Sequence, residues 1–241
     1  MLPRLTRRFR VVTYDARGHG RSAKPTSRYG SDPVVADALA VIRRTRLRRP
    51  LVAGHSWGAM VALELAARHP RSITGAVLVD GGLSTMRDTM DWPTVRERLA
   101  PPHLAGMPLE EFRGMIRTFL GTSVAITPEI EGIVLSVMHV DRLGRIRPRL
   151  SRANHLRILR AIWESDPGAA LARLRVPALA VLAHGAGDPE WDERKRRAAE
   201  RVRRSGAPIR VSWLEGIHDL PLQHPDALAH RIERFSRQLV R

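Results

Sequence analysis

The sequence predicts an α/β fold, in which a mostly parallel sheet carries helices on both faces. Short apolar runs typical of buried strands alternate with longer segments of helical periodicity, which is the pattern of repeated β–α–β units. The runs that predict strands are residues 9–14, 51–53, 73–79, 177–183 and 209–214. At 241 residues, the chain is long enough to bury the core of one such domain and to carry an insertion within it.

Helices are predicted in the intervals between these strands. Asp32 and Pro33 suit the start of a helix that ends near residue 47, with aspartate as the N-cap and proline in the first turn. Further helices are predicted over residues 57–68 and from residue 189 to about 204. A last helix is expected to begin near Asp226.

Strand-like runs are missing between about residues 83 and 175. Apolar side chains recur there at helical spacing in two sets: Leu109, Phe112, Ile116 and Phe119, then Leu156, Leu159 and Ile162. We therefore predict a first core segment over residues 1–82, a helical insertion over 83–175 and a second core segment over 176–241.

The formal net charge of +17 raises the question of nucleic-acid binding. Of the 41 basic side chains only Lys24 and Lys195 are lysines, and the arginines are spread along the chain rather than gathered in one stripe. Such a spread is typical of arginine-rich codon usage, so a basic nucleic-acid-binding module is kept as a remote alternative and no nucleic-acid partner is expected.

Composition also excludes several kinds of site. With no cysteine there is no disulfide and no thiolate metal site, and the histidines lack the spacing of metal ligands. No glycine-rich phosphate loop follows a predicted strand, so neither metal nor cofactor is predicted. No apolar window is long enough to span a membrane, and the first residues lack the apolar core of a signal peptide, which together predict a cytoplasmic location.

A serine stands between a predicted strand and a predicted helix. The pentad Gly-His-Ser-Trp-Gly at residues 54–58 follows the apolar run at 51–53 and matches G-x-S-x-G, the sequence of a nucleophile elbow. A strand-to-helix reversal this tight crowds the backbone, so we expect glycine to be required at both Gly54 and Gly58. Ser56 is then expected to project from the carboxyl edge of the sheet.

Two further segments fit the same chemistry. Residues 15–22 read Asp-Ala-Arg-Gly-His-Gly-Arg-Ser after the first predicted strand, and residues 215–218 read Glu-Gly-Ile-His after the last. Together with the pentad, these motifs resemble the α/β-hydrolase superfamily, which carries a D-x-R-G-x-G-x-S turn, a G-x-S-x-G elbow and a late G-x-H. The resemblance runs from about Phe9 to the end of the chain. It implies the α/β-hydrolase fold, with an all-helical cap over the active site between residues 83 and 175.

The resemblance implies the roles of a nucleophile, a base and an acid. Ser56 is expected to attack and His218 to take its proton, because a neutral hydroxyl is a poor nucleophile. Two aspartates compete as the acid that orients the histidine. Asp80 ends a predicted strand, where haloalkane-dehalogenase-like relatives keep their acid. Asp188 follows the next core strand, where most of the superfamily keeps it, but it stands about two residues late and also suits the N-cap of the following helix.

The oxyanion hole is expected to be incomplete. Its first donor is the backbone N–H of Trp57, the residue after the nucleophile. The superfamily takes its second donor from a His-Gly loop after an earlier strand, and no such loop precedes Phe9. In the resembled fold the absent strand lies between the strands predicted at 9–14 and 51–53, so an N-terminally truncated domain is expected.

These motifs predict a serine hydrolase that acts on a small-molecule carboxylic ester or a related acyl substrate through an acyl-enzyme. The alternative is a truncated relative whose catalysis is impaired. An aspartate nucleophile is absent from the elbow, which disfavours dehalogenase and epoxide-hydrolase chemistry. His19 and His55 are expected to be structural or to line the pocket.

Overall fold

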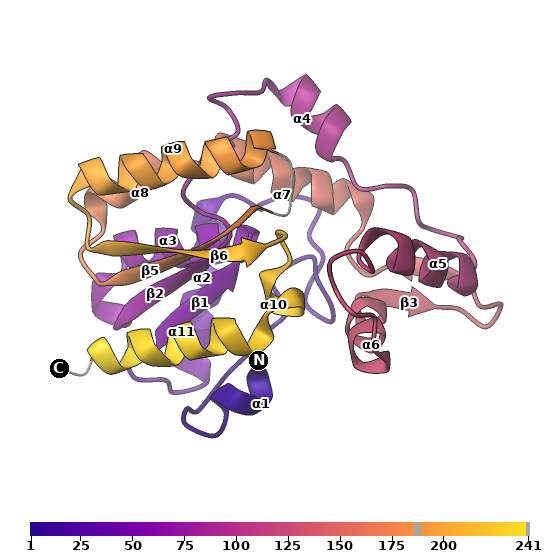
Figure 1. Cartoon of the computed structure of the whole chain (residues 1–241), viewed down its shortest axis with the longest axis horizontal. Helices are drawn as coiled ribbons and strands as arrows, with labels where there is room; N and C mark the ends of the chain where they lie inside the picture. The colour runs from indigo at the N-terminus through magenta and orange to yellow at the C-terminus, as the bar shows by residue number, and fades with distance from the viewer. Residues whose placement is uncertain (186–188, 240–241) are drawn as a thin grey trace.

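The core of the protein is a parallel sheet whose strands all point toward one end of the molecule. The computed structural model describes residues 1–185 and 189–239 (Figure 1). Its main sheet has four parallel strands in the order β1-β2-β5-β6. The strands are β1 (Leu51–His55), β2 (Gly75–Val79), β5 (Ala178–Gly185) and β6 (Ile209–Gly216).

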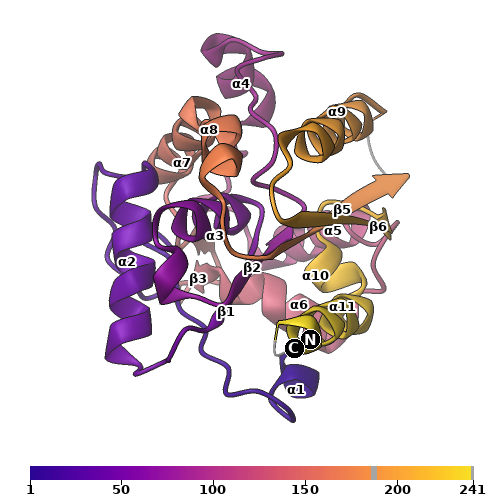
Figure 2. The same cartoon turned by 90° about the vertical axis from the view of Figure 1, so that its left-hand side faces the viewer.

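Alternate side chains of the central strands face two separate apolar layers, as the pleat of a strand requires. In β2, Ala76 and Leu78 belong to the core on one face, whereas Val77 and Val79 belong to the core on the other. Helices cover both faces, with α3 and α9 on one side and α11 on the other (Figure 2). Their bounds are α3 (Trp57–Arg68), α9 (Pro189–Ser205) and α11 (Pro225–Gln238).

Shorter and peripheral helices complete these layers. Helices α2 and α8 pack against α3, and α1 packs against α11 beside the short helix α10. Their bounds are α1 (Leu2–Leu5), α2 (Ser31–Arg44), α8 (Pro167–Arg173) and α10 (Leu220–Gln223), and one turn of 3₁₀ helix (Pro70–Ser72) follows α3. The α/β prediction is therefore confirmed in its layers and in four of its five strands.

The prediction of a strand over residues 9–14 is wrong. The segment carries no strand pairing in the structure, and Phe9 and Tyr14 are 37% and 46% exposed. A β-strand exists only through backbone pairing with a neighbour, and the described chain places no strand beside this segment. As a result β1 lies at the edge of the sheet, paired with β2 alone.

The start of α2 also differs from the prediction. The helix begins at Ser31 with Gly30 as its N-cap, so Asp32 is a first-turn residue and not the cap. Its carboxylate instead lies 2.7 Å from the Arg68 guanidinium at the end of α3. The apolar pattern predicted the position of the helix. It gave no sign that the Asp32 carboxylate, which was expected to cap the helix, forms an ion pair with a residue of another helix.

Most of the segment between β2 and β5 lies beyond the carboxyl ends of the strands, whereas its last helix, α8, packs back against α3 and α9 (Figure 1). It contains α4 (Trp92–Leu99), α5 (Leu109–Phe119), α6 (Pro128–Ser136), α7 (Arg152–Glu164) and α8. The all-helical expectation is incomplete, because β3 (Met138–Val140) and β4 (Ile146–Pro148) form an antiparallel pair within it. Phe112 and Ile116 of α5 pack with Met138 and Ile146 of this pair in a small core separate from those of the sheet.

Candidate active site

The turn from β1 into α3 holds Ser56 in an unusual backbone conformation. Ser56 has φ 54° and ψ −116°, and its N–H donates a 2.9 Å hydrogen bond to the Val79 carbonyl at the end of β2. A side chain at Gly54 would collide with the Gly58 carbonyl, which explains glycine there. At Gly58 a Cβ would meet nothing within 4 Å outside its own helix and chain neighbours, so the requirement for glycine at this second position was wrongly predicted.

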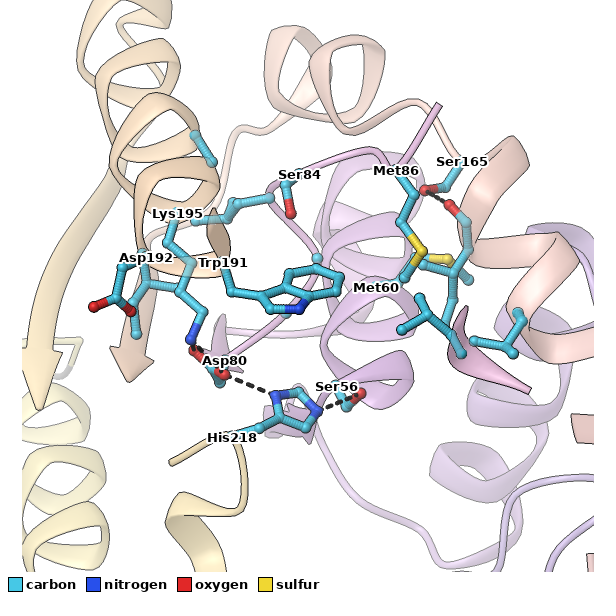
Figure 3. A pocket seen from close by; sticks show the side chains of 18 of the residues that line it. Ser56, Met60, Asp80, Ser84, Met86, Ser165, Trp191, Asp192, Lys195 and His218 are labelled. Carbon is cyan, nitrogen blue, oxygen red and sulfur yellow. Dashed lines mark hydrogen bonds and ion pairs between the residues drawn. The ribbon is translucent and has the colours of Figure 1, made fainter. Parts of the chain in front are cut away.

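Three side chains from the carboxyl ends of three strands form a chain of hydrogen bonds (Figure 3). The Nε2 of His218 lies 3.0 Å from the Ser56 Oγ, and its Nδ1 lies 2.7 Å from the Asp80 Oδ2. Asp80 follows β2 directly, and His218 lies in the loop after β6. Parallel strands end at a common edge, which is why residues so distant in sequence meet there.

Asp80 is the buried end of this chain. Its side chain has no exposed surface, and its backbone has a left-handed φ of 42°. Besides His218, the carboxylate accepts a 2.8 Å hydrogen bond from the Ala183 N–H and pairs with the Lys195 ammonium at 2.9 Å. Burial opposes ionisation, but the His218 hydrogen bond, the Lys195 charge and the Ala183 hydrogen bond outweigh it and lower the pKa of Asp80.

An ionised Asp80 fixes which nitrogen of His218 carries the proton. A carboxylate can only accept, so we assign the proton to Nδ1, which donates to Asp80. Nε2 is then free to accept the hydroxyl proton of Ser56. This is the tautomer that a general base beside a serine nucleophile needs.

The second aspartate considered from the sequence, Asp188, lies outside the described residues. The nearby Asp192 of α9 accepts a 2.9 Å hydrogen bond from the Gly185 N–H. Figure 3 shows its carboxylate turned away from His218. Of the described aspartates, Asp80 is therefore the one that the structure joins to the imidazole.

The backbone N–H and the indole side chain of Trp57 lie in different surroundings. Its backbone N–H is the first of α3 and has no partner within the helix, at the end where the helix dipole attracts negative charge. Its indole is buried, stacked 5.7 Å from the His19 ring and tilted at 6.3 Å from Tyr29. The indole packs behind the elbow and does not line the cavity in the described structure.

A cavity of about 450 Å³ opens at Ser56 and His218. Residues of the core and of the segment between β2 and β5 both contribute to its wall. The wall is largely apolar and includes Met60, Leu83, Met86, Leu159, Ile162 and Trp191. The cavity therefore suits a substrate that places an apolar group next to the serine.

Sequence relatives agree with this architecture. A family model for the alpha/beta hydrolase fold matches residues 1–120. A pimeloyl-acyl-carrier-protein methyl ester esterase from Neisseria meningitidis is 30% identical over 190 residues, which are 76% of this chain and 67% of the esterase. The chain belongs to the α/β-hydrolase superfamily.

Other relatives extend the comparison. A non-heme chloroperoxidase from Streptomyces lividans is 29% identical over 95% of this chain and 82% of its own length. A local match to a protein of Mycobacterium phage D29, 37% identical over 81 residues, spans only 29% of that relative. The solved structure of E-2-(acetamidomethylene)succinate hydrolase superposes with a TM-score of 0.82 over 98% of this chain and 84% of its own. The two sequences are 20% identical, so this superposition shows a shared fold alone.

The two histidines near the elbow of this α/β-hydrolase, His19 and His55, each lie against a backbone carbonyl. The Nδ1 of His19 lies 3.1 Å from the Arg17 carbonyl, beneath the Trp57 ring. His55 contacts the backbone of the His218 loop. His155 of α7, which the sequence did not single out, lines the cavity, and burial followed by the charge of His19 lowers its pKa.

Two residues of α9 were also missed. Trp191 projects into the cavity, and Lys195 reaches the carboxylate of Asp80 (Figure 3). The available signal was composition, since Lys195 is one of only two lysines in an arginine-rich chain. Within residues 1–185 and 189–239, no group of three histidine, aspartate or glutamate side chains could hold a metal ion, and no helix is long and apolar enough to cross a bilayer.

Proposed function

We propose that this α/β-hydrolase is a serine hydrolase that cleaves a carboxylic ester, or a related acyl substrate, through an acyl-enzyme. The observation that carries the proposal is the unbroken Asp80–His218–Ser56 chain of hydrogen bonds at the mouth of an apolar cavity. Ser56 is the nucleophile, His218 the base and Asp80 the acid. The segment 83–175 acts as a cap whose inner side chains complete the cavity.

In the first half-reaction the Oγ of Ser56 attacks the carbonyl carbon of the substrate while Nε2 of His218 takes the hydroxyl proton. Asp80 stabilises the resulting imidazolium through its hydrogen bond to Nδ1. The carbonyl oxygen becomes an oxyanion, and the N–H of Trp57 at the start of α3 donates to it. When the tetrahedral intermediate collapses, His218 returns the proton to the departing alkoxide, which leaves as an alcohol.

In the second half-reaction a water molecule replaces the alcohol. His218 takes a proton from the water as its oxygen attacks the acyl carbon, and the C–O bond to Ser56 then breaks. Ser56 recovers its proton from the imidazolium, and the carboxylic acid departs.

The substrate class follows from the wall of the cavity. Apolar side chains dominate it, so an alkyl or aryl part of the substrate is bound by burial from water. The relative named as a methyl ester esterase supports ester cleavage as the reaction. Short p-nitrophenyl alkanoates are therefore suitable first substrates.

The proposal is tested with a fluorophosphonate probe, which reacts with an activated serine. We expect labelling to map to Ser56 by peptide mass spectrometry and to disappear in Ser56→Ala and His218→Ala. Hydrolysis of p-nitrophenyl butyrate should disappear in parallel. Labelling of another residue, or turnover unchanged in Ser56→Ala, would contradict the proposal.

The same experiment separates the competing function, a catalytically impaired relative. The observation that favours it is the edge position of β1, because the strand that bears the elbow has a partner on one side only. In the resembled fold, the strand on the other side of β1 is followed by the loop that carries the second oxyanion donor. Loss of one such donor lowers rates by about a hundred- to thousandfold. Slow but Ser56-specific labelling without measurable ester turnover would therefore favour the impaired relative.

A further inference from the structure

The ammonium of Lys195 is fully engaged by the buried acid and its surroundings. Its Nζ lies 2.9 Å from Oδ1 and 3.0 Å from Oδ2 of Asp80, and 3.0 Å from the Ala183 carbonyl. An ammonium has three N–H donors, and three acceptors surround this one. The Lys195 side chain is only 18% exposed, so these contacts are largely shielded from water.

The geometry suits lysine rather than arginine. Lys195 reaches from α9 to a carboxylate at the end of β2 and a carbonyl in β5, and so joins three elements of the core. A compact ammonium can meet three acceptors around one point, whereas a planar guanidinium presents its donors in a rigid fork. The position holds lysine in a chain where Lys24 is the only other one among 41 basic residues.

We propose that Lys195 is a positioning residue of the reaction, which holds the carboxylate of Asp80 and shares its negative charge, and thereby sets the lowest pH at which His218 can act as a base. The inference rests on the proposed function. It assigns Lys195 no contact with the reacting atoms.

The ring of His218 lies beside the Asp80 carboxylate, which the Lys195 ammonium contacts from the other side. An isolated carboxylate beside His218 would strongly stabilise the protonated ring and hold the proton to a higher pH. The ammonium of Lys195, bonded to both oxygens of Asp80, offsets part of that attraction and also repels the imidazolium. Removal of the Lys195 charge is therefore expected to make the His218 ring hold its proton to a higher pH.

Other charged or titratable groups lie near His218 or line the same cavity. His55 of β1 faces the imidazole, with ring centroids 4.7 Å apart. Asp219 follows His218 in the same loop, and Asp192 of α9 binds the Gly185 N–H. His155 of α7 lines the same cavity. None of these is bonded to the Asp80 carboxylate among the described contacts.

The test compares pH profiles of kcat/KM for p-nitrophenyl butyrate in the wild type, Lys195→Met and Lys195→Gln. We expect the midpoint of the acid limb to rise by about one pH unit in both neutral variants. At the plateau, kcat should fall about tenfold with little change in KM, because the base is misaligned after substrate has bound. Lys195→Arg should recover most of the shift in the midpoint, since it restores the charge, and less of kcat.

Lys24→Met is the matched control. The Lys24 ammonium bonds only to the carbonyls of Gly20 and Ser22, and no described contact joins it to Asp80 or His218. Its removal should leave the profile unchanged. Lys195→Gln keeps a hydrogen-bond donor without the charge, and it repeats the test if the methionine variant does not fold.

A second readout does not depend on turnover. In a Ser56→Ala background, the midpoint of the His218 ring-proton titration can be followed by NMR with and without Lys195→Met. The same upward displacement of about one unit is expected. Equal midpoints in the two proteins would overturn the role of Lys195, whether or not the wild type hydrolyses the ester. An inactive and unlabelled wild type, with the displacement present, would overturn the proposed function instead.

Discussion

His55 and His218 lie side by side above the end of the sheet, with the Nε2 of His55 2.9 Å from the backbone carbonyl of His218. Burial, then the charge of the neighbouring His218, lowers the pKa of His55, so the ring is neutral near pH 7. Its Nε2–H therefore donates to that carbonyl and fixes the loop that carries the proposed base. The residue before the nucleophile thus supports the base as well as the elbow.

Removing this contact should slow the reaction without abolishing it. In His55→Ala the loop of His218 loses a hydrogen bond worth about 1 kcal/mol, so we expect kcat/KM to fall roughly fivefold. His139→Ala, at an exposed position in β3, should have no effect. Ester hydrolysis of the three proteins, measured side by side, checks the prediction. A decrease equal to that of His218→Ala would mean that His55 itself moves protons.

His55 should also make stability depend on pH. Its folded-state pKa is lowered, so the unfolded chain binds a proton that the folded chain refuses as pH falls through about 6.5. Stability is therefore lost toward low pH, with a slope of at most about 1.4 kcal/mol per pH unit from this one group. Urea unfolding between about pH 7.5 and 5 should show a shallower loss in His55→Gln than in the wild type. Parallel curves would contradict the assignment.

The choice between the two candidate acids can be made by substitution. Asp80→Asn removes the acceptor that fixes the His218 tautomer, and we expect kcat to fall by about three to four orders of magnitude. Asp188→Asn and Asp192→Asn should each change kcat by less than about threefold, because neither is expected to bond the imidazole. Thermal unfolding of each variant separates lost activity from lost fold. The reverse ranking would return the role of acid to Asp188.

The positions of Ser56, His218 and Asp80 could be predicted because each follows an apolar run. Strand ends are visible in the local sequence, and parallel strands bring their carboxyl ends together. The sequence alone does not distinguish Asp80 from Asp188, since both follow predicted strands. In the structure, hydrogen bonds across the sheet join Asp80 to His218 and to the Ala183 N–H, and that information is not local.

Features that depend on distant partners were missed or wrongly predicted. Lys195 contacts Asp80 across 115 positions of sequence, and a helical pattern gives no sign of it. Residues 9–14 have the composition of a strand, but strand formation depends on a pairing partner that local sequence does not contain. The β3–β4 pair was not predicted for another reason. Its strands have three residues each, which is too short to show an alternation of apolar and polar side chains.

The charge of the cavity should limit its substrates. Lys195 is the one lysine or arginine among the described residues that line it, and its donors are occupied by Asp80 and Ala183. A substrate carboxylate would be buried there, beside Asp192, with no lysine or arginine of the described lining free to pair with it. We expect kcat/KM for ethyl butyrate to exceed that for monoethyl succinate by at least about tenfold. Equal values, measured by pH-stat titration, would show that an anion is accommodated.

The two glycines of the elbow should respond in opposite ways to the same substitution. In Gly54→Ala the new methyl group would collide with the Gly58 carbonyl, a backbone atom that cannot move without displacing the first turn of α3. We expect a loss of about 2 kcal/mol or more in unfolding free energy, since overpacking forces the backbone to shift. Gly58→Ala places its methyl group in open space within a helix, where alanine is favoured over glycine by up to about 1 kcal/mol. Urea unfolding at neutral pH measures both changes against the wild type. If Gly58→Ala were as destabilising as Gly54→Ala, the crowding at the elbow would have to extend into the helix, and the geometry proposed for Ser56 would need revision.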